Sequence, residues 1–123
     1  MLKSILLVGF GGAIGSILRF LISFGIKQLG TTLFPYATFS INIIGCLLIG
    51  ILYGISEKNN LGNSDFNYLL IIGFCGGFTT FSTFAHENYN LFQQQNFLFP
   101  LINIALSVIL GILAVKIGYK IIP

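Results

Sequence analysis

Residues 73–84 read GFCGGFTTFSTF, in which a glycine pair precedes a run of phenylalanines and four hydroxyl side chains. Glycine weakens a helix, whereas hydroxyl groups are costly in an apolar environment unless they are hydrogen-bonded. Backbone freed from a helix is tolerated at membrane depth only when it is buried in protein or lines a water-filled cavity. The stretch therefore predicts a membrane helix that is broken at Gly76 and Gly77.

The composition of the whole chain agrees with a membrane location. Of its 123 residues, 55% are hydrophobic and 7% are charged, and the mean hydropathy is +0.94. Soluble domains carry about 25% charged residues, so this chain lacks the groups that would cover a soluble surface. We predict an all-α membrane protein that forms a single domain over residues 1–123.

Four apolar stretches are long enough to cross a membrane, because one spanning helix needs about 20 residues. They cover about residues 4–26, 35–56, 68–84 and 98–117, and the third continues into a more polar segment. The lysines and the arginine near the span ends are divided unequally between the two sides: Lys3, Lys58, Lys116 and Lys120 on one, Lys27 and Arg19 on the other. This weak bias favours cytoplasmic termini and leaves insertion in both orientations open.

The charge and the cysteines exclude other classes of protein. The net charge of +3 comes from scattered residues rather than from a basic run, so nucleic acid is not an expected partner. Cys46 and Cys75 both fall within apolar stretches, where they are either small buried side chains or a disulfide. Small residues recur four apart, as in Gly11 with Gly15, and indicate close helix packing within one chain or between two copies.

Polar groups within membrane spans usually face a cavity or a partner. Apart from one arginine they are amides and hydroxyls: Arg19, Thr38, Ser40, Asn42, Thr79, Thr80, Ser82, Thr83, Asn103 and Ser107. Glu87, at the end of the third span, is the only carboxylate near these groups. Side chains that donate hydrogen bonds without fixed negative charge suit an anion.

Phe81 and Phe84 lie about 60° apart on a helix, because successive residues advance by about 100°. Their ring edges carry partial positive charge and could face an anion. Each candidate also has a structural explanation. The phenylalanines could pack or face lipid, the hydroxyls could bond to their own helix, Asn42 could join two helices, and Arg19 could extend to the interface.

The stretch at 73–84 resembles the signature of the CrcB, or Fluc-type, fluoride channel family. Further support comes from GGAIGSILRF at 11–20, ATFSINIIG at 37–45 and NIALSVILG at 103–111, so the resemblance covers all four spans. It implies an antiparallel, dual-topology homodimer in the bacterial plasma membrane with two fluoride pores, each lined by both subunits.

The resemblance also implies roles for individual residues. Phe81 and Phe84 would form an aromatic box around permeating fluoride, and Asn42 would donate a hydrogen bond close to it. Carbonyl groups of Gly76 and Thr79 would bind a structural sodium ion at the dimer centre. The polar path and its entrance would add Thr38, Ser82, Thr83, Asn103, Ser107 and Arg19.

Two positions depart from the family pattern. Ala37 stands where members commonly have glycine, and Asn103 stands where tyrosine is frequent. We expect a channel, not an enzyme, that lets fluoride leave the cytoplasm passively and so limits its toxicity. The alternative is a small four-helix multidrug or cation exporter, which would require an essential carboxylate in the membrane.

Overall fold

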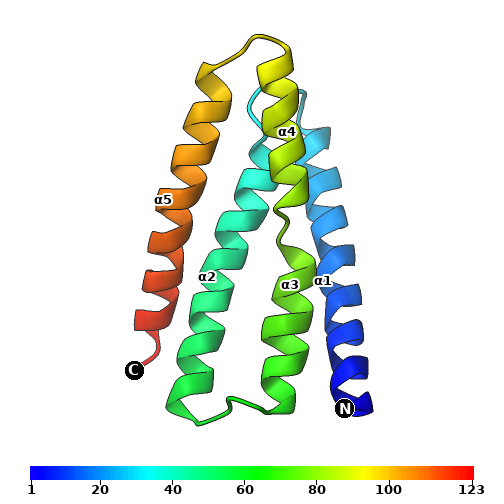
Figure 1. Cartoon of the computed structure of the whole chain (residues 1–123), viewed down its shortest axis with the longest axis vertical. Helices are drawn as coiled ribbons and strands as arrows, with labels where there is room; N and C mark the ends of the chain where they lie inside the picture. The colour runs from blue at the N-terminus through cyan, green and yellow to red at the C-terminus, as the bar shows by residue number, and fades with distance from the viewer.

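The computed structural model describes residues 1–123 as helices standing side by side (Figure 1). Four helical stretches are long and apolar enough to cross a membrane, so the chain is a multi-pass membrane protein. For most of the span ends, the predicted and the observed positions agree to within a few residues. The elements are α1 (Leu2–Gln28), α2 (Tyr36–Lys58), η1 (Asn67–Cys75), α3 (Gly76–Phe78), α4 (Ser82–Gln93) and α5 (Leu98–Ile121).

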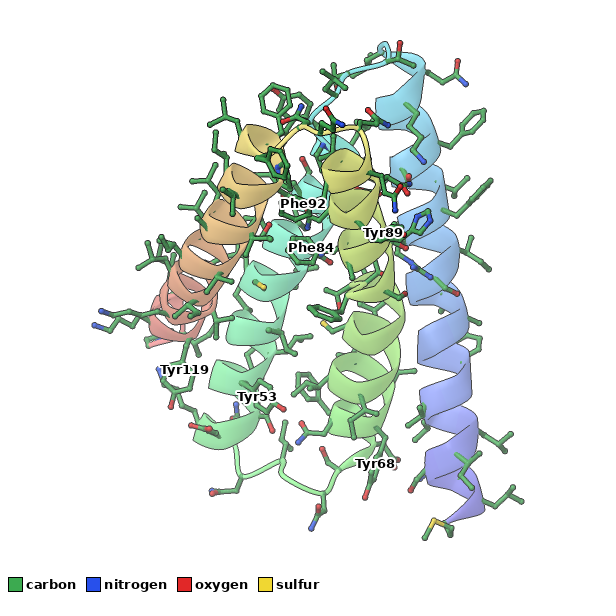
Figure 2. All side chains as sticks on the ribbon, turned by 45° about the horizontal axis from the view of Figure 1, so that its top comes forward. Tyr53, Tyr68, Phe84, Tyr89, Phe92 and Tyr119 are labelled. Carbon is green, nitrogen blue, oxygen red and sulfur yellow. The ribbon has the colours of Figure 1, made fainter.

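The third span consists of three consecutive pieces: η1, α3 and α4. Figure 1 shows the irregular segment between α3 and α4. Its first piece, η1, is a π-helix of nine residues, a form that is rare and often found at functional sites. Both chain termini lie at the end of the molecule where α2 is joined to η1. Tyr53, Tyr68 and Tyr119 gather at the same end (Figure 2), which is typical of the aromatic residues at a membrane interface.

Glycine allows α1 to lie directly against the third span. A Cβ atom added to Gly11 would stand 2.1 Å from the Leu69 carbonyl oxygen, and one added to Gly15 would stand 2.2 Å from that of Phe74. From the other side, a Cβ on Gly77 would stand 2.5 Å from the carbonyl oxygen of Gly12. The regularly spaced glycines of the two helices thus serve close packing within one chain.

The second close helix pair is α2 with α5. A Cβ atom on Gly50 would stand 2.2 Å from the Val115 carbonyl oxygen, and one on Gly118 would stand 2.3 Å from that of Leu47. Both cysteines are free thiols, and the Cys46 sulfur lies next to Gly111. The expectation of small packed side chains is therefore confirmed over that of a disulfide.

The predicted break in the third span exists, but its predicted position was wrong. Gly76 has helical dihedral angles, φ −62° and ψ −37°, and the helix continues to Phe78. The backbone becomes extended at Thr79, with ψ 160°, and α4 starts at Ser82. The reason is that Gly77 is needed for contact with Gly12, whereas the residues after Phe78 find hydrogen bonds outside the helix.

Candidate functional site

The break at Thr79–Phe81 is held by the side chain of Asn42 from α2. The Asn42 Nδ2 atom donates to the Thr80 carbonyl oxygen at 2.9 Å, and the Thr80 backbone N–H donates to Asn42 Oδ1, also at 2.9 Å. One amide thus satisfies both backbone groups of a residue that has left the helix. This is the helix-to-helix role considered for Asn42, because its amide oxygen and one amide hydrogen are already in use.

Hydrogen bonds at the break leave two carbonyl groups of the third span without their usual helical donors. In a continuous α-helix the N–H of Thr80 would donate to the Gly76 carbonyl, but here it donates to Asn42. The N–H of Thr83 would donate to the Thr79 carbonyl, but here it donates to the Thr80 hydroxyl at 3.3 Å. The carbonyls of Gly76 and Thr79, which the family resemblance implies as sodium ligands, are therefore not engaged by these two helical hydrogen bonds.

Phe81 and Phe84 follow the break and lie together. Their ring centroids are 5.9 Å apart with an angle of 39° between the ring planes. Figure 2 shows Phe84 on the side of α4 that faces α2. Phe81 is 79% exposed and Phe84 is half-buried, so a single chain leaves most of this pair uncovered.

The hydroxyl groups near the break divide into exposed and buried ones. Ser82 and Thr83 are exposed at the start of α4, and the Ser82 hydroxyl lies 3.5 Å from that of Thr80. Thr38 on α2 is 5% exposed and donates to Glu87 Oε1 at 2.6 Å. The other carboxylate oxygen of Glu87 is buried without a hydrogen-bond partner.

A second polar cluster joins α4 to α5. The Ser107 hydroxyl donates to Asn103 Oδ1 at 3.2 Å, and Asn103 Nδ2 donates to Asn88 Oδ1 at 3.0 Å. Asn103 is 1% exposed and Asn88 is 4% exposed, so this chain of hydrogen bonds lies inside the helix bundle. Sequence reasoning found Asn103 and Ser107 but missed Asn88, whose signal was its place four residues after Phe84 on one helix face.

A cavity of about 580 Å³ opens at the end of the molecule where α1 connects to α2. Lys27, Tyr36, Glu87 and Asn90 are among its lining residues. Glu87 therefore lies between this opening and Thr38, on the way to the break. Arg19 is half-buried on α1 and forms no ion pair, and it does not line this cavity.

The structure thus places the predicted residues in separate groups. One group surrounds the break and contains Asn42, Thr80, Phe81 and Phe84, and Thr38 pairs with Glu87 close by. Asn103 and Ser107 belong to the α4–α5 cluster, while Arg19 is apart from all of these in a single chain. The sequence identifies Thr80 and Glu87 only as polar residues, and the folded chain shows their partners.

Comparison with known proteins matches residues 6–119 to the family described as "CrcB-like protein, Camphor Resistance (CrcB)". A protein of Azobacteroides pseudotrichonymphae, named "Fluoride-specific ion channel FluC", is 47% identical over 119 residues, which cover 97% of this chain and 95% of that protein. Proteins with the same name from Flavobacterium psychrophilum and Phocaeicola vulgatus are each 45% identical over 117 residues. These alignments cover 95% of this chain and 94% and 96% of the two relatives.

Proposed function

Because the chain belongs to the CrcB-like family, we propose that it is a fluoride-selective ion channel through which fluoride leaves the cytoplasm passively. The observation that carries this proposal is the 47% identity with a fluoride-specific ion channel over 97% of the chain. The family is one of ion channels, not of enzymes. Passive export would keep the internal fluoride concentration below toxic levels without an energy source.

The chemistry around the break supports an anion as the permeating species. The edges of the Phe81 and Phe84 rings carry partial positive charge, which attracts an anion more weakly than a full charge would. Hydroxyl groups of Ser82 and Thr83 are exposed beside the rings and can donate hydrogen bonds. Weak attraction combined with several donors permits an ion both to enter and to leave, as conduction requires.

We further propose that the channel is an antiparallel homodimer with two pores. A single chain leaves Phe81 79% exposed, although this residue lies in the middle of a span. A second copy would cover this surface and enclose a path between the two subunits. Antiparallel pairing would be compatible with the weak charge bias between the two ends of the chain.

A structural sodium ion at the dimer centre is also part of this proposal. The carbonyl groups of Gly76 and Thr79 fit such a site, because the N–H groups of Thr80 and Thr83 donate elsewhere. Released carbonyls of broken membrane helices are common ligands of sodium. Two copies would supply four such oxygens, and a cation between them would offset the repulsion among their dipoles.

Fluoride efflux from liposomes tests the function directly. Purified protein would be reconstituted into liposomes loaded with potassium fluoride, and efflux would be followed with a fluoride electrode after addition of a potassium ionophore. We expect rapid fluoride release, with protein-free liposomes as the control, and no comparable chloride release from matched liposomes loaded with potassium chloride and followed with a chloride electrode. Release that depends on a proton gradient, or on an organic cation substrate, would instead support the exporter.

A further inference from the structure

Asn88 is a buried side chain that the proposed pathway does not yet use. It lies one helical turn after Phe84 on α4, and residues four apart share one face of a helix. The face that carries Phe84 therefore continues directly to the amide of Asn88. The residue is 4% exposed, and its Nδ2 atom is buried without a hydrogen-bond partner.

The neighbours of Asn88 explain why its nitrogen is free. The hydroxyl of Ser107 donates to Asn103, and Asn103 in turn donates to the Asn88 oxygen. Each residue in this series of hydrogen bonds donates to the next one. The NH₂ of Asn88, at the end of the series, is therefore left without an acceptor. Glu87 does not take this role, since it is directed to Thr38 on α2 whereas Asn88 is directed to α5.

A free amide NH₂ buried inside the helix bundle is costly if it serves packing alone. Water is absent from the bilayer core, and buried polar groups without partners lower stability. Polar residues inside membrane proteins are accordingly associated with ion and substrate pathways. An acceptor that is present only part of the time, such as a permeating ion, would satisfy the donor at Asn88.

We propose that the Asn88 amide is an additional binding group for the permeating anion, donating an N–H hydrogen bond one helical turn beyond Phe84. This inference rests on the proposed function, because it takes fluoride to be the ion that moves along this face. The ligand class is a small anion that accepts hydrogen bonds. Asn103 and Ser107 act as positioning residues, since they hold the Asn88 oxygen and thereby direct its nitrogen away from themselves.

Asn88→Asp tests the inference, because aspartate keeps the oxygen that accepts from Asn103 but removes the donor. We expect fluoride efflux to fall at least about tenfold, which corresponds to the loss of a hydrogen bond to a charged group. Gln93→Glu is the matched control, because it makes the same chemical change at an exposed position of α4. The control should keep efflux near that of the unmodified protein, and both variants should elute like it in size-exclusion chromatography.

The outcomes separate this inference from the proposed function. If the unmodified protein releases fluoride and Asn88→Asp releases it equally fast, the amide has only a packing role and the inference is wrong. If the unmodified protein releases no fluoride, the proposed function itself fails.

Nuclear magnetic resonance provides a readout that does not depend on a folded variant. The side-chain amide signals of the unmodified, ¹⁵N-labelled protein would be recorded in sodium fluoride and in sodium chloride. We expect the Asn88 NH₂ signals to shift in fluoride alone, while those of the loop residue Asn63 stay constant. If these hydrogen bonds ran in the opposite direction, the unpaired group of Asn88 would be its oxygen, which cannot donate to fluoride. The absence of any fluoride-dependent shift would therefore contradict the inference.

Discussion

Individual side chains around the break fall into two kinds, according to whether contacts within the chain already occupy the groups that could interact with an ion. Asn42 forms two bonds to the backbone of Thr80, so its main work is to shape the break. The rings of Phe81 and Phe84, in contrast, have edges that one chain does not cover. In the proposed channel, residues of the first kind would position the path, and residues of the second kind would be available to the ion.

The phenylalanine pair yields the first prediction. Replacing Phe81 or Phe84 by isoleucine keeps an apolar side chain but removes the positively polarised ring edge. We expect each variant to remain folded and to reduce fluoride efflux about tenfold or more, if the edges contribute an interaction of about 1.4 kcal/mol. Phe24→Ile, at an exposed position of α1, is the control and should leave efflux unchanged. Unchanged efflux in both pore variants would favour a packing role for the pair.

The second prediction concerns Asn42. Asn42→Leu has a similar size but removes both bonds to Thr80, leaving a part-buried N–H and C=O without partners. We expect the free energy of unfolding to fall by about 1–3 kcal/mol for each group left unpaired, and efflux to fall with it. Asn63→Leu makes the same exchange in the exposed α2–η1 connection. Stability measured by denaturation in detergent should respond only to the change at 42, and equal stability of the two variants would rule out the structural role.

At the scale of elements, the third span has to satisfy two requirements at once. Its first half, η1 and α3, packs against α1 through glycine. Its second half, α4, begins after the break, and its side chains therefore point in other directions than those of a continuous helix would. The close contact keeps the backbone helical through Phe78, which explains why the glycine pair does not itself form the break. The helix ends at Thr79, whose hydroxyl donates a hydrogen bond to the Cys75 carbonyl oxygen at 2.9 Å.

A pair of alanine substitutions tests this division. A Cβ on Gly77 would meet backbone atoms of Gly12, the closest at 2.5 Å, and backbone cannot move aside as a side chain can. We expect Gly77→Ala to destabilise the fold by about 1–3 kcal/mol through overpacking. Gly25→Ala places the same methyl group where no atom lies within 4 Å and should not destabilise the fold. Thermal stability in detergent would show the difference, and equal midpoints would contradict the packing explanation.

At the scale of the whole molecule, apolar side chains cover the outer faces of the helices. Twenty of the 123 residues are buried, and long stretches of α1 and α5 expose leucine and isoleucine. Lipid can cover these faces, but it cannot satisfy the exposed polar groups around the break. The surface is thus compatible with the proposed second copy at the break and with lipid contact elsewhere.

Orientation in the membrane gives the fourth prediction. The basic residues are few, so adding three lysines to the α2–η1 connection should hold that loop on the cytoplasmic side. We expect this variant alone to lose fluoride efflux, because an antiparallel dimer needs both orientations. Co-expression with a copy that carries three lysines in the α4–α5 connection should restore efflux. Full activity from either biased copy by itself would exclude antiparallel pairing.

The fifth prediction concerns the proposed sodium ion. Exchange of sodium for a large organic cation on both sides of the membrane, followed by long equilibration, should lower fluoride efflux and weaken the dimer. Thr79→Ser should have little effect, because the proposed ligand is the main-chain carbonyl. Gly76→Leu should weaken the dimer without unfolding the chain, since a Cβ at this position meets no atom of another helix within 4 Å. Unchanged efflux and dimer stability without sodium would eliminate the site.

Sequence reasoning predicted the helical class, the four spans and the existence of a break. These features follow from local properties, namely the length of apolar stretches and the behaviour of glycine and hydroxyl residues. It also identified Phe81 and Phe84 as neighbours, which the 5.9 Å separation of their rings confirms. The position of the break was wrong because it depends on contacts with other helices, namely Gly12 on α1 and Asn42 on α2.

The amino-acid sequence by itself determined that this chain crosses a membrane four times, because hydropathy and span length act residue by residue along the chain. Only the tertiary structure decided which polar groups are already satisfied. Asn42 and Asn88 are the same residue type, yet one has both of its polar atoms bonded to Thr80 whereas the other has a free nitrogen. That difference arises from the partners brought by neighbouring helices, and a hydrogen bond between distant residues leaves no local mark in the sequence.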